Sequence, residues 1–421
     1  MPAELAAYSV LEAVFSFFVW VVTSPYLKVS GVTPLEYGFF AAIISGASIA
    51  SLPLAGWLSD RFRPVPLLAY GQVLAAASAA LIATARLPLI MLAAAVTGFQ
   101  HSLGWIPYEI LLSRLVGRER YHYAYPLSFT LFQVGGIAGG FLGWVPQLLP
   151  NLARVPLPTA YRYSILAAGA AQLALIPLLA KLGWGAGGAS AEAAAAARRR
   201  SGGGGLRGLW GELKAFATLL KSVPEPSRKV LSALAVSEAV IGFGAGVGIA
   251  NASYYFILKY GVGSGALGTM QGVESGLIAA VSLATPKISE RVGGTVKAYV
   301  GVAVLSVPLL AAITFVNSFP AAAALYVART ALMNAAAPLM QAFIMRATPD
   351  GLRGRVNSLL ALASDIPRVV GSPVGGYLLS RVSLEAPFRV TAATYFAALA
   401  YLAGKARGFS ESPAGRGEGR G

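Results

Sequence analysis

The chain has 421 residues, of which 56% are hydrophobic and 12% charged, and its formal net charge at pH 7 is +16. Soluble domains carry charge on about 25% of their residues, so this composition excludes an ordinary soluble fold and favours an integral membrane protein. The absence of cysteine excludes disulfides and thiolate metal sites, and the two histidines, His101 and His122, argue against a histidine-rich metal centre. We therefore predict no cofactor.

The positive charge has two interpretations, nucleic-acid binding or contact with anionic lipid. Basic residues with interleaved aromatics, which would indicate a nucleic-acid surface, do not form a stripe in this sequence. The Lys and Arg residues lie in short segments between apolar runs, where they face the lipid headgroups of the inner leaflet. We therefore expect the bilayer, and not a nucleic acid, to be the partner of this charge.

The apolar runs predict an all-α integral membrane protein with twelve transmembrane helices. A spanning helix needs about 20 mostly apolar residues, and the long runs without two-residue alternation favour helices over a barrel. Because the first residues carry no basic region, the first run is expected to be a retained span and not a cleaved signal peptide. The predicted spans are residues 5–26, 34–58, 65–85, 87–115, 123–149, 160–182, 227–259, 264–285, 295–316, 319–345, 356–380 and 386–406.

The distribution of Lys and Arg predicts the orientation. With both termini in the cytoplasm, 24 of the 33 basic residues fall on the inside and seven on the outside, as the positive-inside rule requires. We expect a multi-pass protein of the plasma membrane with both termini cytoplasmic.

One long connection divides the chain. Residues 183–205 are almost entirely Gly, Ala and Ser around three arginines, which is typical of a flexible linker. Residues 206–221 have the spacing of an amphipathic helix, lying on the inner membrane face or packed on cytoplasmic loops. The predicted organisation is a six-helix bundle over 1–182, a cytoplasmic linker over 183–226, a second six-helix bundle over 227–408 and a disordered cytoplasmic tail over 409–421.

The two halves repeat three features. Ser59-Asp60-Arg61 returns 230 positions later as Ser289-Glu290-Arg291, in each case between two apolar runs. The basic entry to span five, residues 117–120, corresponds to residues 351–355 before span eleven. Glycines at 135–140 correspond to the run 371–376. Two parallel six-span repeats are the layout of alternating-access transporters.

These residues resemble the major facilitator superfamily of secondary transporters. The run G-W-L-S-D-R-F-R-P over 56–64 is similar to the signature of that family between spans two and three, and the linker and the Arg-Gly-Arg entry to span eleven are similar too. The resemblance covers the whole chain. It implies two six-helix domains around a central cavity that opens alternately to either side.

The resemblance also implies a gate on the cytoplasmic side. Gly56 would allow a close approach of helices, and Asp60 would latch the gate by pairing with Arg114 or Arg118 and with the start of span eleven. Arg61 would hold orientation, and Glu290 with Arg291 would be the matching elements of the second half. A solvated turn with positive-inside arginines is the alternative. Thr97 stands where proton antiporters of the family often carry an arginine, which weakens an assignment to proton-driven drug efflux.

Charged residues within spans are candidates for the substrate or proton pathway, because a charge at mid-bilayer costs roughly 2.5–3.5 kcal/mol on insertion scales. Asp365 and Arg368, three positions apart, share a helical face and form either a self-neutralising pair or a binding site. Glu274 either binds or pairs with Arg329. The candidates are Glu12, Gln100, His101, Tyr108, Gln133, Glu238, Asn251, Glu274, Arg329, Asn334, Gln341, Asp365 and Arg368.

The predicted function is secondary active transport of a small solute by alternating access, with the chain acting as a monomer. A proton is one expected coupling ion, with Glu238 and Glu12 as its carriers, because a carboxylate in a dry cavity can cycle between charged and neutral forms. The alternatives are an ion-independent facilitator and, from another class, a membrane enzyme or sensor. The loops contain no nucleotide loop, paired zinc ligands or serine elbow, so we predict that the chain is not an enzyme.

Overall fold

The computed structural model of the chain describes residues 1–116, 121–183, 225, 227–292, 295–348 and 353–406. Several predicted features lie outside these residues: most of the flexible linker with its amphipathic helix, the predicted tail and Arg118. The side chains of Glu290 and Arg291 also lie outside the described part. Within it the secondary structure is helical, and no strand occurs.

The described residues form twelve membrane helices, which confirms the predicted fold class. Three of the helices consist of consecutive segments. The first half contains α1 (Ala3–Val29), α2 (Pro34–Arg61), α3 (Pro64–Ile82), α4 (Leu87–Val116), α5 (Tyr121–Phe141) continuing through η1 (Leu142–Trp144) into α6 (Val145–Ala153), and α7 (Leu157–Leu173) continuing into α8 (Leu175–Lys181). The second half contains α11 (Ser227–Gly244) continuing through η2 (Ala245–Ile249) into α12 (Ala252–Tyr260), α13 (Ser264–Val292), α14 (Thr295–Ile313), α15 (Phe319–Ala347), α16 (Arg353–Arg381) and α17 (Ala386–Lys405).

Within the described residues, eight helices are long and apolar enough to cross a membrane by length and composition alone. The helices α13, α15, α16 and α17 are not among these eight. Helices α13, α15 and α16 contain intramembrane charges of the second half, at Glu274, Arg329, Asp365 and Arg368.

Local sequence signals fix where the helices begin and end. Thr33 caps α2 in a reciprocal capping box with Glu36, and Pro34 occupies the first turn, where its missing N–H costs nothing. Gly261 ends α12 in a left-handed conformation, with φ of 66°. These signals keep the connections short and the neighbouring helices antiparallel.

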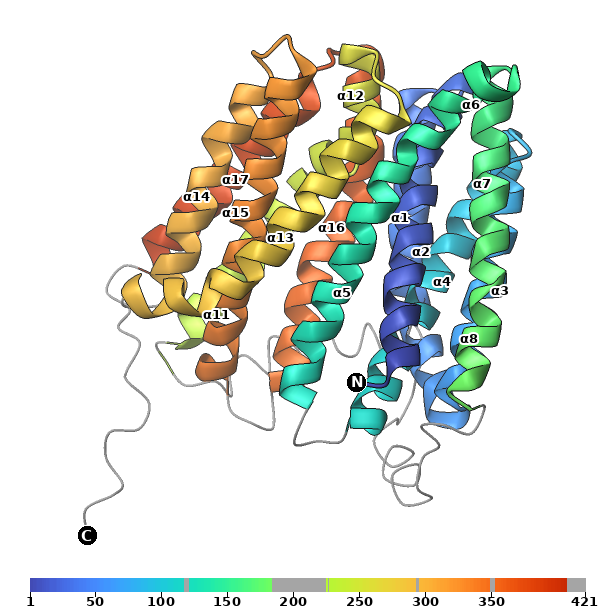
Figure 1. Cartoon of the computed structure of the whole chain (residues 1–421). Helices are drawn as coiled ribbons and strands as arrows, with labels where there is room; N and C mark the ends of the chain where they lie inside the picture. The colour runs from blue at the N-terminus through green and yellow to red at the C-terminus, as the bar shows by residue number, and fades with distance from the viewer. Residues whose placement is uncertain (117–120, 184–224, 226, 293–294, 349–352, 407–421) are drawn as a thin grey trace.

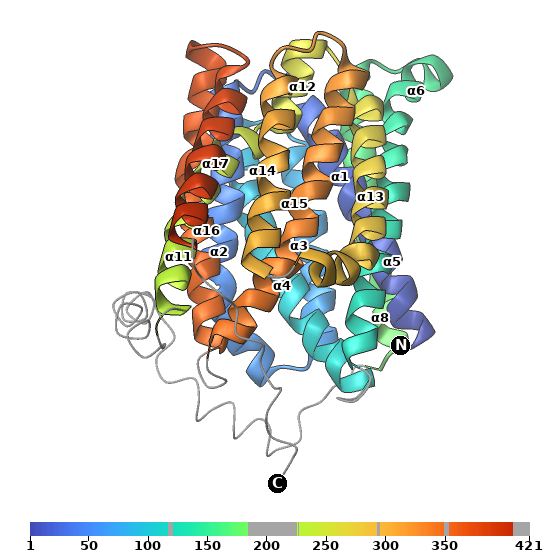
Figure 2. The same cartoon turned by 90° about the vertical axis from the view of Figure 1, so that its left-hand side faces the viewer.

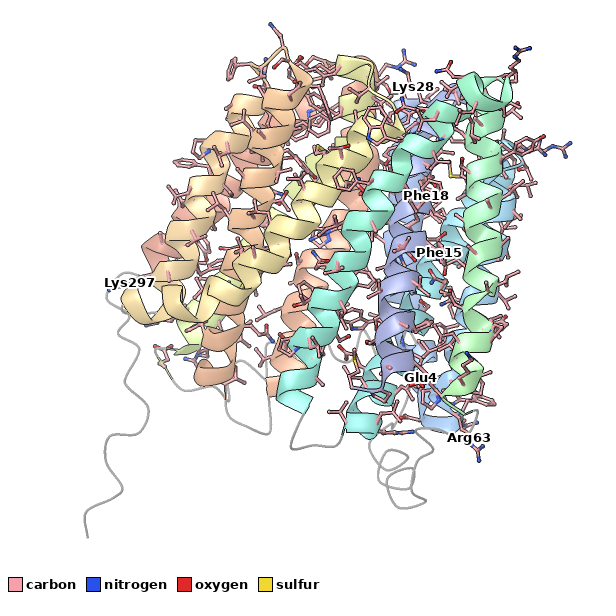
Figure 3. The ribbon with its side chains drawn as sticks, in the orientation of Figure 1. Glu4, Phe15, Phe18, Lys28, Arg63 and Lys297 are labelled. Carbon is pink, nitrogen blue, oxygen red and sulfur yellow. The ribbon has the colours of Figure 1, made fainter. Side chains whose placement is uncertain are left out.

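The helices gather into two bundles that stand side by side (Figure 1), α1–α8 forming the first and α11–α17 the second. The N-terminus lies at one end of the molecule, here called the terminal end, and the opposite end is called the distal end. Figure 2 shows the same arrangement after a quarter turn. In Figure 3, Glu4, Arg63 and Lys297 lie toward the terminal end and Lys28 at the distal end, with Phe15 and Phe18 along α1 between them.

The bundles meet through two helix pairs, α2 on α16 and α5 on α13. Glycine allows the backbones to touch: a Cβ placed on Gly38 would lie 2.6 Å from the Ser372 carbonyl oxygen of α16, and one on Gly140 would lie 2.5 Å from the Gly268 carbonyl oxygen of α13. Gly38 and Gly268 are 230 positions apart, so the two pairs are copies of one contact. All of these residues belong to the distal halves of their helices, and we call the two contacts together the distal closure.

The glycine-rich stretch at the end of α11 and in η2 packs closely against α16 and α17. Gly242 and Gly246 face carbonyl groups of α16, while Gly244 and Gly248 face the side chains of Thr394 and Thr391 on α17. The helix widens there into the π-helical segment η2. The glycines therefore hold this cavity-lining helix tightly against the rest of the second bundle.

Candidate functional site

A cavity of about 590 Å³ lies between the two bundles. The first bundle supplies its wall from α1, α2, α3, α4, α5 and α7, and the second from η2, α12, α13, α15 and α16. Its volume falls in the range of roughly 300–1,000 Å³ that is typical of small-molecule sites. The distal closure blocks one end of the space between the bundles, so this state of the protein is closed at the distal end.

Polar side chains enter the cavity from both bundles. Gln100 and His101 of α4 and Gln133 of α5 line the first-bundle side. Glu274 of α13 and Arg368 of α16 line the opposite side. Five of the predicted pathway residues therefore share one cavity, and together they offer one carboxylate, one guanidinium, one imidazole and two amides to a solute.

The rest of the wall is largely apolar and aromatic. The aromatic members are Phe17, Trp20, Phe40, Phe132 and Tyr326. An apolar wall with a few convergent polar groups is the usual composition of a small-molecule site, because apolar area gives affinity and the polar groups fix orientation.

Arg329 lies behind the cavity wall and not in it. It is 4% exposed, donates a hydrogen bond from Nη2 to the Tyr395 hydroxyl at 3.0 Å and stacks its guanidinium 5.3 Å from the centre of the Tyr395 ring. Its Nε has no hydrogen-bond partner among the described residues. Arg329 is within electrostatic range of Glu274, although the two form no ion pair within 4 Å among the described side chains. Arg329 therefore places a positive charge near Glu274 without lining the cavity itself.

Glu238 is also buried behind the wall. It is 9% exposed and accepts a hydrogen bond from the Tyr299 hydroxyl at 3.1 Å. Asp365 and Arg368 are within its electrostatic range. The Asp365 and Arg368 side chains themselves are 3.9 Å apart and about 40% exposed, too long a separation for a strong pair. Arg368 is therefore free to act on a solute in the cavity.

Other predicted pathway residues take part in helix packing. Asn251 is fully buried and donates from Nδ2 to three backbone carbonyl groups, among them Ser372 at 3.0 Å. Tyr108 bonds Ser9 at 2.6 Å and also Ser128. Asn334 bonds a carbonyl group of its own helix, and Gln341 bonds Asn357 on α16. These four do not line the cavity described above.

The sequence reading did not single out two cavity residues, Gln172 on α7 and Gln271 on α13. A glutamine in an apolar span costs free energy unless its amide is bonded, so a scan for every glutamine inside a span would have found both. The sequence analysis also did not single out Ser16 on α1, which accepts a hydrogen bond from Gln172 at 3.1 Å.

The expected close approach of a helix at Gly56 is not present in this structure. A Cβ built on Gly56 meets no described atom within 4 Å. Ala55 and Ser59 at the same end of α2 are buried, so the open space is limited to the face of the helix that carries Gly56. Asp60 and Arg61 are exposed at that end, Arg114 is within electrostatic range of Asp60, and the Arg61 guanidinium stacks 4.1 Å from the centre of the Trp57 ring.

Comparison with solved structures identifies the fold. The chain superposes on a bacterial homologue of the iron transporter ferroportin in its inward-facing state with a TM-score of 0.70, covering 96% of this chain and 97% of that one at 13% identity. A bacterial homologue of the human lysosomal transporter Spinster, inward-facing and occupied, gives 0.71 with 98% of both chains covered at 12% identity. The nucleoside transporter NupG gives 0.72, covering 96% of this chain and 98% of that one at 12% identity.

At these identities the likeness establishes the fold alone. No curated protein sequence matches the chain. The family model of the Major Facilitator Superfamily matches residues 5–328 and 234–420, which together span nearly the whole chain. With its two six-helix bundles and the cavity between them, the chain belongs to the Major Facilitator Superfamily and is a secondary transporter.

Proposed function

We propose that this transporter carries a small solute that has both a positive and a negative group on a partly apolar body. The observation that supports this proposal is the presence of Glu274 and Arg368 in one cavity with aromatic walls. A guanidinium binds carboxylate or phosphate oxygens in a bidentate manner, and a carboxylate binds an ammonium group. A solute with only one charge would leave one of these two groups desolvated without a partner, which is unfavourable.

The first-bundle side of the cavity supplies the remaining contacts. Gln100, His101 and Gln133 provide donors and acceptors that orient the neutral part of the solute. Because the wall comes from both bundles, rocking of one bundle against the other carries the bound solute from one side to the other. The described state, closed at the distal end, is then the inward-facing state if the termini are cytoplasmic.

Transport experiments in proteoliposomes test the substrate class. A panel should contain aromatic zwitterions, simple organic acids, amphiphilic cations and neutral sugars. We expect zwitterions to be transported, Arg368→Gln to lose selectivity against cations, and Glu274→Gln to lose selectivity against anions. A substrate whose transport is unaffected by both substitutions would contradict this assignment.

We also propose that the protein resides in the plasma membrane as a monomer. We propose that both termini lie in the cytoplasm, because most Lys and Arg residues would then be on the inside. Cysteine accessibility tests the orientation, because the natural chain contains no cysteine. A cysteine replacing Glu4 should react with an impermeant maleimide only after the membrane is opened, and one replacing Ser30 should react in intact cells.

Coupling to protons is proposed through the second bundle. Glu238 is buried and lies within electrostatic range of Arg368. Protonation of Glu238 would remove a negative charge near Arg368 and so make the potential around that guanidinium more positive for the solute. Flux driven by an imposed pH gradient should be lost in Glu238→Gln. The second candidate function is an ion-independent facilitator. It is supported if the flux of the wild type is unchanged after the proton gradient is collapsed.

A further inference from the structure

A second polar site lies in the first bundle, at the edge of the cavity where α1 meets α7. Tyr8, Glu12 and Ser16 are spaced by four residues on α1 and therefore share one face of that helix. Ser16 donates from its hydroxyl to Glu12 Oε1 at 2.8 Å and accepts from Gln172 Nε2 of α7 at 3.1 Å. Gln72 of α3 donates a hydrogen bond from Nε2 to the Tyr8 hydroxyl at 2.8 Å. The site therefore includes side chains from three helices, α1, α3 and α7.

The Glu12 carboxylate has no positive partner in this site. Among the described residues no Lys, Arg or His forms an ion pair with Glu12, and its hydrogen bond comes from the neutral Ser16. A carboxylate inside a span is unfavourable unless a positive charge or a proton compensates it. The site therefore requires one positive charge that the described protein does not supply.

Two buried amide oxygens of these residues have no hydrogen-bond donor among the described residues. Gln72 is 2% exposed and Gln172 3% exposed, and the Oε1 atom of each has no hydrogen-bond partner among the described residues. Buried amide oxygens are normally bonded, so two unbonded ones on side chains that bond the Tyr8–Glu12–Ser16 face of α1 are unusual. A single proton on Glu12 adds one donor, whereas a metal cation accepts several oxygen ligands at once.

We propose that Glu12, Ser16 and Gln172 bind a monovalent metal cation, with Tyr8 and Gln72 positioning the Glu12 side of the site. One carboxylate and neutral oxygens balance one positive charge, whereas a divalent ion would be left with an excess charge. A half-turn of the Gln172 amide exchanges its nitrogen and oxygen, which brings Oε1 to the Ser16 side. This site is separate from the proposed solute contacts, Glu274 and Arg368, and does not depend on them.

The cation has a route into this site. Ser16 and Gln172 both line the central cavity, and Glu12 lies one helical turn behind Ser16 on the same face of α1. An ion that enters the cavity from the open side can therefore reach Ser16 and Gln172 first and Glu12 next. Because α1 and α7 also form the cavity wall, occupation of the site would join two of the helices that surround the solute.

Thermal unfolding of the purified full-length transporter tests the proposal without knowledge of the solute. The protein is titrated with NaCl or KCl against choline chloride at constant ionic strength. We expect a saturable rise of about 3 °C or more in Tm with at least one of the two metal ions. Binding of ²²Na⁺, or of ⁸⁶Rb⁺ if potassium is preferred, measures the dissociation constant directly.

Two substitutions locate the ion. Glu12→Gln should abolish the metal-dependent rise while the Tm in choline is equal to or above that of the wild type, because the variant removes an uncompensated charge and keeps the hydrogen bond to Ser16. Gln172→Leu should weaken binding by tenfold or more. Glu238→Gln is the matched control, since it neutralises a buried carboxylate of the other bundle, and it should keep the full response.

Three results would overturn the proposal. The first is a metal-dependent rise in Tm that persists unchanged in Glu12→Gln. The second is stabilisation by lower pH alone, with no response to either alkali metal, which would make Glu12 a proton site. The third is stabilisation by micromolar Ca²⁺ without a response to Na⁺ or K⁺, which would exclude a monovalent site.

Discussion

Tyr37 of α2 and Tyr254 of α12 stack across the boundary between the two bundles, with ring centroids 4.4 Å apart and an angle of 20° between the rings. Tyr254 also donates its hydroxyl to the carbonyl oxygen of Val32, in the loop before α2. Tyr37 shares a hydrogen bond of 3.0 Å with Ser24 of its own bundle. Both tyrosines are buried, so this contact ties the second bundle to the first at the distal end, beside the distal closure.

Tyr254→Phe should loosen the distal end. The change removes the hydroxyl bond between the bundles and keeps the stacking, so we expect a loss of about 0.5–1.5 kcal/mol from the distally closed state. That free energy corresponds to a roughly 2- to 10-fold larger population open at the distal end. A cysteine at cavity residue Ser45 reports the change through its rate of labelling by an impermeant maleimide added on the distal side.

The matched control for this substitution is Tyr260→Phe. The Tyr260 hydroxyl bonds the Val316 carbonyl group within the second bundle, at 2.8 Å. Its removal should leave the labelling rate at position 45 unchanged. Equal acceleration by both substitutions would mean that the Tyr254 bond has no special part in closing the distal end.

Gly38→Ala should prevent the α2–α16 contact from forming. The added methyl group would lie 2.6 Å from the Ser372 carbonyl oxygen, well inside contact distance, and the backbone on both sides leaves no flexible atom to yield. We expect the distally open state to dominate and transport to fall at least tenfold. Gly71→Ala on α3, where a Cβ meets no described atom within 4 Å, should have no effect on either measurement.

Asn251→Leu should reduce stability without changing substrate affinity. The substitution leaves the Gly246, Val247 and Ser372 carbonyl groups without their amide donor, and we expect a loss of about 1–3 kcal/mol. Thermal unfolding measures the loss, and KM of the folded fraction should equal that of the wild type. Asn334→Leu removes one bond within α15 and should cost less. A raised KM for Asn251→Leu with unchanged stability would place Asn251 in the substrate path instead.

The ion pair between Glu385 and Lys259 predicts a pH dependence at the distal surface. The two side chains are 3.2 Å apart. Partial burial acts to raise the pKa of Glu385, but hydrogen bonds from its own backbone and from Lys259 outweigh it and lower the pKa below the ordinary value. A lowered pKa in the folded state contributes stability above the unfolded pKa of about 4.3, and that contribution is lost as the pH falls through the folded pKa.

Glu385→Gln should therefore lower Tm at pH 7 by the equivalent of roughly 0.2–1 kcal/mol and leave it close to the wild-type value at the lowest pH that the protein tolerates. Unfolding curves collected between pH 7 and pH 3.5 measure the difference. Glu4→Gln, at an exposed position, should follow the wild type throughout. A constant difference between Glu385→Gln and the wild type at every pH would show that the ion pair is not its source.

Length and apolarity were enough to predict the twelve helices, because the bilayer imposes one span length and one solvent on every segment. The repeat could also be recognised in the sequence, since the glycines of spans five and eleven recur at a fixed separation. In the structure Gly140 touches α13 and Gly376 touches α2, so the repeated glycines form equivalent contacts in the two halves.

The direction in which each polar residue points was decided only by tertiary structure. Gln100 and Gln133 line the cavity, whereas Asn251, which carries the same amide group, bonds the backbone of α16. Each residue turns a helix by 100°, so the rotation of one span against its neighbours decides between cavity and core, and that rotation is set by packing from distant parts of the chain. The sequence alone determined which residues are costly in a membrane. Only the packed bundles determined which of these residues are hydrogen-bonded to another helix and which remain available to a solute or an ion.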